Sequence, residues 1–155
     1  MQLQAPSSFL HKAVNKLDAK GRVSIPAPYR QLLAQENLNG VFCIPSFFSD
    51  ALEGFGETLL AEFRQRLRKS DPLLDEAHDD LAHAVCTQAQ FLNFDDEGRV
   101  RLPEDLIHHA GIVDRVAFIG LDQKFQMWDP TRLEPVERDR LARVRAMRRG
   151  NGGAS

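Results

Sequence analysis

Residues 17–26 read Leu17-Asp18-Ala19-Lys20-Gly21-Arg22-Val23-Ser24-Ile25-Pro26, and the pattern returns 77 positions later as Phe94-Asp95-Asp96-Glu97-Gly98-Arg99-Val100-Arg101-Leu102-Pro103. Five of the ten aligned positions are identical, and two more keep an apolar residue. An internal repeat of this kind decides the architecture before any single element is assigned. The sequence therefore predicts a protein built from two similar halves.

Each repeat predicts a tight turn followed by a short strand. Gly21 and Gly98 permit the positive φ that a tight turn needs, and the carboxylates of Asp18 and Asp95 can accept hydrogen bonds from the amides of the turn. We assign these four residues a loop-structuring role. Each repeat is thus predicted to form a hairpin that turns at Asp-x-x-Gly-Arg and is stopped by a proline.

Apolar and polar residues alternate strictly after each turn, which is typical of a half-buried strand. The apolar set, which should point into the core, is Val23, Ile25, Val100 and Leu102. The polar set, which should share the solvent face, is Arg22, Ser24, Arg99 and Arg101.

Helical spacing and apolar runs predict the other elements. In the first half these are a strand at 9–17, a helix at 27–36 and strands at 41–44 and 52–55. In the second half they are a helix at 104–110, ended by Gly111, and strands at 116–119 and 125–128. Between the halves, one helix is predicted within 56–71, and another from Asp75 toward Val85, after the break at Asp71-Pro72.

The run Leu-Asp-x-Lys-Gly-Arg-Val-Ser-Ile-Pro-x-x-Tyr-Arg from Leu17 to Arg30, followed by a second Asp-x-x-Gly-Arg-Val-x-Leu-Pro, resembles the MraZ family. The resemblance extends from about Phe9 to Pro130 and includes Gly120 and the Trp128-Asp129 ending. A single Asp-x-x-Gly-Arg indicates only a turn, whereas the pair at this spacing is specific.

The resemblance implies a bacterial transcriptional regulator of the division and cell-wall gene cluster. It implies two AbrB-like (SpoVT-AbrB) swapped-hairpin modules per chain, whose Asp-x-x-x-Arg loop regions present the DNA-contacting surface. It also implies that protomers assemble into rings, to which the segment between the halves contributes.

We expect an α+β fold in which two AbrB-like modules pack together, with helices between and after them. A unit of roughly 45 residues buries too little surface to stand alone, so the modules should share strands or pack face to face. The expected divisions are residues 7–55 and 89–132 for the modules, 56–88 for the helical connection and 133–155 for a basic helix and tail.

Positive charge gathers at the first turn although the whole chain has a net charge of −2 and a pI near 6.2. Between residues 16 and 30, Lys16, Lys20, Arg22 and Arg30 face only one carboxylate, Asp18, a net charge of +3. Any nucleic-acid surface must therefore be local. A two-stranded ribbon fits the DNA major groove, where Arg22 would contact a base or a phosphate and the lysines mainly phosphates. Arg30 is predicted to belong to the same DNA-binding set. Without the resemblance, an ordinary solvated hairpin would explain these charges as well.

The second turn differs in charge. The carboxylates Asp95, Asp96, Glu97, Glu104 and Asp105 outnumber Arg99 and Arg101, which gives residues 95–105 a net charge of −3. Only Arg99 and Arg101 are therefore carried over as DNA contacts. Alternatively, this acidic loop meets a basic surface of a neighbouring protomer, such as the arginine-rich tail.

The tail from Thr131 to Arg149 carries seven arginines and three carboxylates, a net charge of +4, on a helical pattern with a partial apolar stripe. Three roles stay open: added phosphate contacts, a subunit interface, or a solvent-exposed terminal helix. Residues 150–155, Gly-Asn-Gly-Gly-Ala-Ser, are expected to fray.

Catalysis and metal binding have little support in the sequence. His83 and Cys86 could share a helix face, but no second pair at ligand spacing follows, and His108 and His109 project about 100° apart on a helix. We expect no catalytic residue, no metal and no cofactor. Cys43 and Cys86 are predicted to be reduced and buried.

The N-terminus, Met1 to Ser8, lacks the features of a signal peptide, and no stretch is long enough to span a membrane. We therefore expect a cytoplasmic, nucleoid-associated protein. Our hypothesis is a sequence-specific repressor that binds repeats in promoter DNA as an oligomeric ring. The alternatives are an antitoxin-like or other AbrB-fold regulator, an assembly protein that binds no DNA, and a small enzyme.

Overall fold

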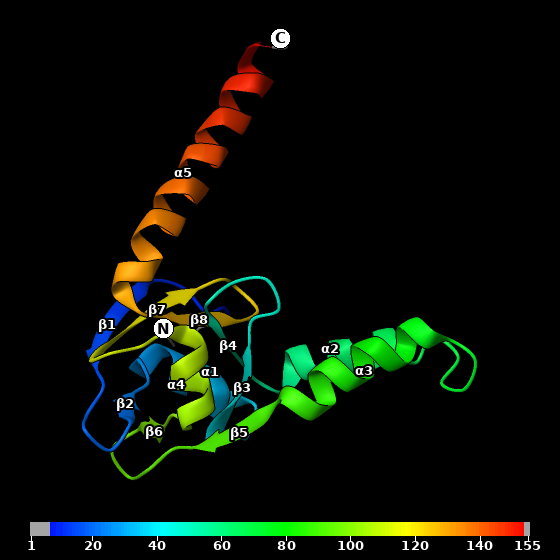
Figure 1. Cartoon of the computed structure of the whole chain (residues 1–155), viewed down its shortest axis with the longest axis horizontal. Helices are drawn as coiled ribbons and strands as arrows, with labels where there is room; N and C mark the ends of the chain where they lie inside the picture. The colour runs from blue at the N-terminus through cyan, green and yellow to red at the C-terminus, as the bar shows by residue number, and fades with distance from the viewer. Residues whose placement is uncertain (1–6, 154–155) are drawn as a thin grey trace, which may run out of the picture.

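The computed structural model describes the backbone of residues 7–153 and the side chains of residues 7–150. It is a mixed α+β structure, as predicted: a β-sheet body from which two helical arms project in different directions (Figure 1). One arm is the pair α2 (Glu57–Leu67) and α3 (Glu76–Gln88), and the other is α5 (Pro130–Gly153).

The two halves contain matching elements in the same order. The first half consists of β1 (Lys12–Lys16), β2 (Arg22–Ser24), α1 (Ala27–Gln35), β3 (Gly40–Pro45) and β4 (Leu52–Phe55). The second consists of β5 (Gln90–Asn93), β6 (Arg99–Arg101), α4 (Glu104–Ala110), β7 (Arg115–Gly120) and β8 (Phe125–Trp128). The repeat read from the sequence is therefore a structural repeat.

Strands are exchanged between the halves. The six-stranded sheet has the order β1-β7-β8-β4-β3-β5, and β2 pairs with β6 in a separate two-stranded ribbon. The order is symmetric, because each half lends its first strand to the other half. In the register, Val23 lies opposite Val100 and Glu53 opposite Gln126, which places these two pairs on a pseudo-twofold axis. The swap implied by the family resemblance thus occurs within one chain.

The simple hairpin predicted for each repeat is wrong in its pairing. Within the described chain, β1 pairs with β7 rather than with β2, and β5 pairs with β3 rather than with β6. The turns themselves close locally, for example through Gly21 N–H to Asp18 O at 3.0 Å. Pairing across the axis prevails because it buries Val23 and Val100 together, each only 1% exposed. Burying a side chain of this size contributes about 1.5–3 kcal/mol.

The predicted alternation is confirmed: Val23, Ile25, Val100 and Leu102 are at most 2% exposed. Helices α1 and α4 pack onto the same core through residues such as Leu33 and Leu106.

The predicted first strand from Phe9 is too long. His11 has φ +70°, which breaks the extended backbone before Lys12, and Phe9 forms only an isolated bridge with Asp122.

The α2–α3 arm has no fully buried residue in either helix. Helix α2 ends at Leu67, earlier than the predicted limit. Helix α3 continues to Gln88, past the predicted end near Val85. At its start, the Asp75 side chain accepts a hydrogen bond from Ala77 N–H at 3.0 Å. Helix α3 packs only partly against its neighbours and Cys86 is exposed, so the prediction that both cysteines are buried is wrong for this one. Cys43 is buried in β3, and burial raises the pKa of its thiol to about 12.

Helix α5 starts at Pro130, directly after Asp129, whose carboxylate accepts a hydrogen bond from Thr131 N–H at 3.0 Å. The buried side chain of Leu133 anchors the helix to the body. The helix extends to Gly153, into the tail for which the sequence predicts fraying. Ala154 and Ser155 lie outside the described residues. No helix in the described part of the chain combines the length and apolar character needed to cross a membrane.

Candidate nucleic-acid interface

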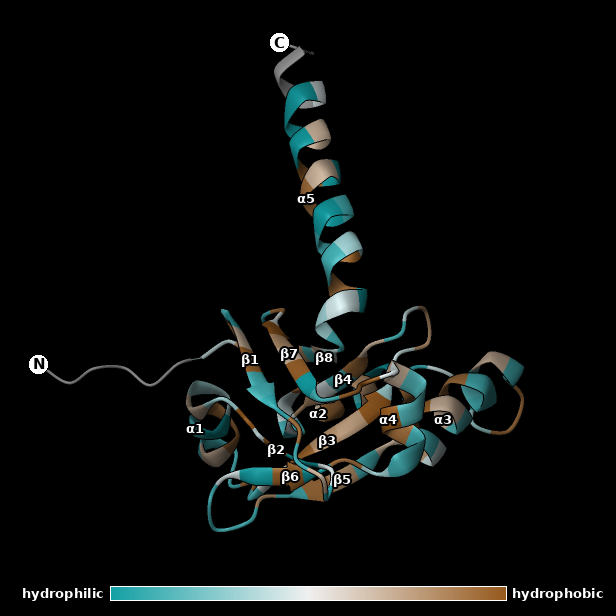
Figure 2. Cartoon of the chain, turned by 60° about the vertical axis from the view of Figure 1, so that its left-hand side comes forward, coloured by the Kyte–Doolittle hydropathy of each residue, from teal (hydrophilic) through white to brown (hydrophobic). Residues whose placement is uncertain are grey.

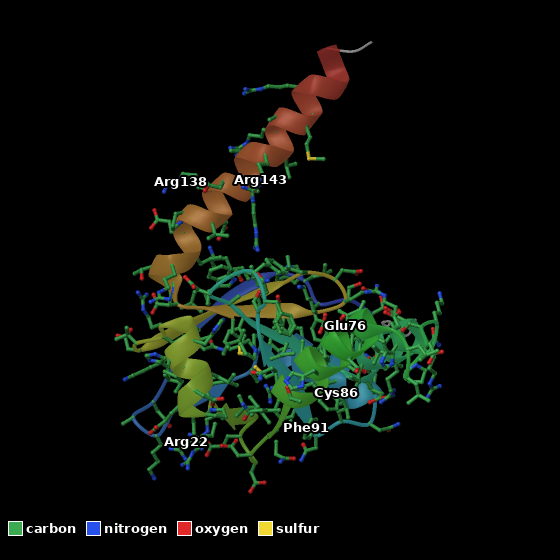
Figure 3. All side chains as sticks on the ribbon, turned by 45° about the vertical axis from the view of Figure 1, so that its right-hand side comes forward. Arg22, Glu76, Cys86, Phe91, Arg138 and Arg143 are labelled. Atoms are coloured by element: carbon green, nitrogen blue, oxygen red, sulfur yellow. The ribbon has the colours of Figure 1, made fainter. Side chains whose placement is uncertain are left out.

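The two Asp-x-x-Gly-Arg loops lie on either side of the β2–β6 ribbon. We call the outward side of the ribbon and these loops, residues 17–24 and 94–101, the ribbon face. It lies at the opposite end of the body from α5 in Figures 1 and 2, and Figure 3 shows Arg22 pointing away from the body there. The inward side of the ribbon is sealed by Val23 and Val100.

In the first loop, a single carboxylate organises the turn. Asp18 accepts hydrogen bonds from Lys20 N–H at 2.9 Å, Arg22 N–H at 2.8 Å and the Arg22 side-chain Nε at 2.7 Å. These bonds, first of all the one from the Arg22 backbone, lower the pKa of Asp18 from 3.8 to about 2. Gly21 has φ +79°, so a side chain there would be strained.

The second loop repeats this geometry. Asp95 accepts hydrogen bonds at 2.9 Å from Glu97 N–H, Arg99 N–H and Arg99 Nε, and Gly98 has φ +77°. The hydrogen bond from the Arg99 backbone N–H is the largest cause that lowers the pKa of Asp95. The hydrogen bond from the Arg99 side chain to Asp95 raises the pKa of Arg99. All four loop-structuring residues occupy equivalent turn positions in the two halves.

The ion pair between aspartate and arginine in each loop is a feature that the sequence analysis missed. Its signal was the i, i+4 spacing of Asp18 and Arg22 and of Asp95 and Arg99. Each pair holds its guanidinium through Nε, which leaves the terminal nitrogens of Arg22 to donate to a partner outside the loop, whereas Nη2 of Arg99 also lies 3.4 Å from Glu97 of its own loop. An arginine fixed in this way loses less side-chain entropy when it binds.

The ribbon brings arginines from both halves onto one face. Arg22 lies opposite Arg101, and Ser24 opposite Arg99. Arg101 and Ser24 are exposed, whereas Arg22 and Arg99 are half-buried by their loops. The face is therefore symmetric in backbone but not in side chains, because Arg101 corresponds to Ser24 and Glu97 to Lys20.

Lys16 and Lys20 are both exposed on the side of the first loop. Lys16 ends β1, where its cross-strand partner is Arg115 of β7, a cation that the sequence analysis did not select. Arg115 comes from the second half, so only the strand exchange places it next to Lys16.

Arg30 lies behind the second loop. Its Nε donates to Ile25 O at 3.0 Å, and a Cβ on Gly98 would come within 2.6 Å of the Arg30 Cζ. In the other half, Ile107 occupies the equivalent place under Gly21. Its Cδ1 would lie 3.6 Å from a Cβ added to Gly21. The geometry therefore makes Arg30 a support of the Gly98 loop.

Within residues 7–150, no three His, Cys, Asp or Glu side chains are grouped to hold a metal ion. The chemistry that the ribbon face offers is hydrogen-bond donation by cationic side chains from a rigid two-stranded element.

Comparisons with known proteins agree with the family resemblance read from the sequence. Residues 85–143 match the family described as "MraZ protein, putative antitoxin-like". The chain is 42% identical to the protein named transcriptional regulator MraZ of Xanthobacter autotrophicus, over 93% of this chain and 91% of that protein. The proteins of the same name from Azorhizobium caulinodans and Rickettsia canadensis are 41% and 40% identical, over 95% and 81% of this chain and 93% and 84% of theirs.

Proposed function

Because this chain belongs to the MraZ family, whose relatives named above are transcriptional regulators, we propose that it regulates transcription by binding double-stranded DNA through the ribbon face. Specifically, it represses the division and cell-wall gene cluster by binding promoter repeats as an oligomer, a ring of chains. It acts in the cytoplasm at the nucleoid and needs neither a cofactor nor catalysis.

One observation carries the proposal: three arginines from both halves, two of them held by aspartates, lie on the outward side of a two-stranded ribbon. A ribbon of this kind fits the major groove, and an arginine can donate two hydrogen bonds to O6 and N7 of guanine. Arg22, Arg99 and Arg101 would read bases or contact phosphates, while Lys16 and Lys20 would contact phosphates.

The charge of one ribbon face is small, which supports binding by several chains together. Its cations Lys20, Arg22, Arg99 and Arg101, with Lys16 next to the face, are accompanied by the carboxylates of Asp18, Asp95, Asp96 and Glu97. A single face can therefore neutralise few phosphates. Linked faces on repeats about one helical turn apart, roughly 10 base pairs, gain affinity through effective concentration.

The test starts from the DNA that co-purifies with the protein, which is sequenced to define the site. Arg22→Ala should then weaken binding to this site by about 1–3 kcal/mol without lowering the melting temperature of the protein substantially. Arg68→Ala, an exposed arginine on the α2–α3 arm, is the matched control and should bind like the parent. Equal binding by the Arg22 variant would show that the ribbon face is not the DNA surface.

The family description favours one second candidate, an antitoxin-like regulator that also holds a protein partner. Such a regulator would co-purify with a second polypeptide at a fixed ratio. A preparation from the native organism that contains only this chain and DNA would argue against this candidate.

A further inference from the structure

Helix α5 divides into two parts with different surroundings. The first part, residues 130–140, is attached to the body. Leu133 is buried there, and a terminal nitrogen of Arg140 donates a hydrogen bond to Gln126 Oε1 at 3.2 Å. In the second part, residues 141–150, every residue is exposed. We call this second part the distal arm, because it extends away from the body (Figures 1 and 2).

The distal arm is strongly basic. It contains four arginines and no carboxylate, a net charge of +4, in a chain whose net charge is −2. The arginines are Arg143, Arg145, Arg148 and Arg149. Among the side chains of residues 7–150, no carboxylate lies within ion-pair distance of any of them. The described part of the chain therefore leaves this charge unpaired.

The carboxylates of α5 lie in its first part, before the distal arm. They are Glu134, Glu137 and Asp139. Glu137 already pairs with Lys12 of β1, whose Nζ lies 2.9 Å from Glu137 Oε2. The positive charge is thus concentrated at the end of the helix that is farthest from the body, where an anionic partner meets no opposing carboxylate of α5.

Three of the four arginines gather on one side of the distal arm. Arg148 and Arg149 follow Arg145 by three and four residues, which places them one turn further along the same face. Arg145 and Arg149 are about 6 Å apart along the helix axis, a distance over which one DNA strand presents about two phosphates. The spacing of these side chains therefore suits a phosphate backbone.

We propose that the distal arm is a second DNA-binding surface, which binds phosphates without regard to sequence, and that the protein thereby bridges two DNA segments. One segment lies on the ribbon face and the other on the distal arm. The inference rests on the proposed function, because the ribbon face holds the first segment.

The two surfaces lie at opposite ends of the molecule. Figure 3 shows Arg143 on α5 at one end and Arg22 of the ribbon face at the other, with the body between them. A straight duplex that lies across the ribbon face therefore does not reach the distal arm of the same chain. The arm is placed to hold a separate duplex, or a remote part of the same DNA molecule.

The side chains of the distal arm favour phosphate contact over base reading. An arginine stays charged at any physiological pH and can donate two parallel hydrogen bonds to a phosphate. Apart from its arginines, the arm contains only leucine, alanine, valine, methionine and glycine, which have no hydrogen-bonding side chain. Contacts with phosphates alone carry no sequence information. The second segment can therefore have any sequence.

A membrane surface suits the distal arm less well. Its large apolar side chains are only Leu141, Val144 and Met147, and it contains no aromatic residue. A helix that lies in a membrane interface needs a broad apolar face, commonly with tryptophan, phenylalanine and several leucines. Three separate apolar side chains provide little area for such insertion, whereas the arginines suit the high charge density of DNA.

A capture assay with two duplexes tests the bridge. One duplex carries the site defined by the co-purified DNA and is fixed to beads, and the other is a fluorescent duplex of random sequence. The parent protein should hold the fluorescent duplex on the beads. The arm variant, with Arg145→Gln, Arg148→Gln and Arg149→Gln, should remain on the beads and capture at least about tenfold less, since each lost phosphate contact lowers the slope of log K against log salt by about 0.9.

Glutamine has nearly the helix propensity of arginine, so the arm variant should keep α5 helical. The conservative control carries lysine at the same three positions, which retains the charge, and it should capture the fluorescent duplex nearly as well as the parent. A second control carries Arg66→Gln, Arg68→Gln and Lys69→Gln, which make the same change in net charge at exposed positions near the end of α2, and it should also retain capture.

Capture by the arm variant at the level of the parent would overturn the inference. So would a change in the mass of the DNA-free assembly in this variant, measured by sedimentation velocity, because the arm would then be a contact between chains. Binding of the parent to vesicles of phosphatidylglycerol that the arm variant loses, with unchanged DNA capture, would assign the arm to a membrane instead.

The same assay separates this inference from the proposed function. Arg22→Ala should release the protein from the bead-bound site, which tests the ribbon face alone. A parent protein that stays on the beads but captures no second duplex would contradict the bridge and leave the ribbon face supported. An Arg22 variant that stays on the beads as the parent does, while the arm variant captures less, would contradict the ribbon face and support the arm.

Discussion

Glu53 and Gln126 lie opposite each other in the β4–β8 register, and Gln126 Nε2 donates a hydrogen bond to Glu53 Oε2 at 3.2 Å. Both side chains are buried, at 7% and 1% exposure, on the pseudo-twofold axis. Gln126 Oε1 in turn accepts hydrogen bonds from Trp128 Nε1 at 3.0 Å and from an Arg140 terminal nitrogen at 3.2 Å. Lys124 Nζ lies 3.2 Å from Glu53 Oε1 as an ion pair without hydrogen-bond geometry. The network joins the centre of the sheet to the base of α5.

Gln126→Leu should destabilise the protein by about 1–3 kcal/mol, because Glu53 and Trp128 would each lose a buried hydrogen-bond partner. Urea unfolding followed by circular dichroism measures the free energy of unfolding. Gln123→Leu, an exposed glutamine in the neighbouring loop, is the control and should change stability by less than about 0.5 kcal/mol. Equal effects of the two substitutions would show that the buried network contributes nothing to stability.

Gly98→Ala should destabilise the second loop for two reasons: its φ of +77°, and the Arg30 side chain, which occupies the space of the new methyl group. The backbone strain alone costs about 1–2 kcal/mol. Arg30→Ala empties this space. The double variant Gly98→Ala, Arg30→Ala should therefore lose less free energy of unfolding than the sum of the losses in the two single variants. Gly21→Ala, combined with Arg30→Ala, is the control pair and should be additive within about 0.5 kcal/mol. Additivity in the Gly98 pair would mean that Arg30 does not support the loop.

The stability of the first loop should depend on acid pH through Asp18. Its pKa is lowered from 3.8 to about 2 in the folded chain, so the ionised carboxylate favours the folded state above pH 3.8. This contribution should decline as the pH falls from about 4 and be lost below about 2. Asp18→Asn should be less stable than the parent at neutral pH, with the difference shrinking over that range. Carbon NMR titration of the Asp18 carboxyl gives the midpoint directly, and a midpoint near 3.8 would contradict the hydrogen bonds that this carboxylate accepts, first of all the one from the Arg22 backbone N–H.

The side-chain asymmetry between the loops predicts different roles in DNA binding. Lys20→Ala should lower affinity and reduce the slope of log K against log salt, by about one unit for each phosphate that the lysine neutralises in the complex. Glu97→Ala at the equivalent position should leave affinity unchanged or raise it slightly, because a carboxylate is repelled by phosphates. Titrations over a range of salt concentrations measure both. A sequence-dependent loss of affinity in the Glu97 variant would instead indicate that this side chain accepts a hydrogen bond from the amino group of cytosine.

Local features of this fold were determined by the sequence itself. The glycines at 21 and 98 and the aspartates three residues before them specify the turns, because these properties depend only on backbone sterics and on neighbouring amides. The alternation after each turn correctly placed Val23, Ile25, Val100 and Leu102 in the core, since side chains of a strand point to opposite faces in turn. The 77-residue repeat correctly indicated two matching halves.

The tertiary structure alone decided which strands pair and what surrounds each side chain. Strand pairing depends on the apolar surface that distant segments bury together, so β1 joins β7 and the expected local hairpins do not form. The same exchange brings Arg115 beside Lys16 and Arg101 opposite Arg22, and it places Arg30 behind the Gly98 loop. Cys86 lies on an apolar-looking stretch, yet it is exposed because α3 projects from the body. A sequence pattern shows which residues can be buried, whereas the packing of distant elements decides which of them are.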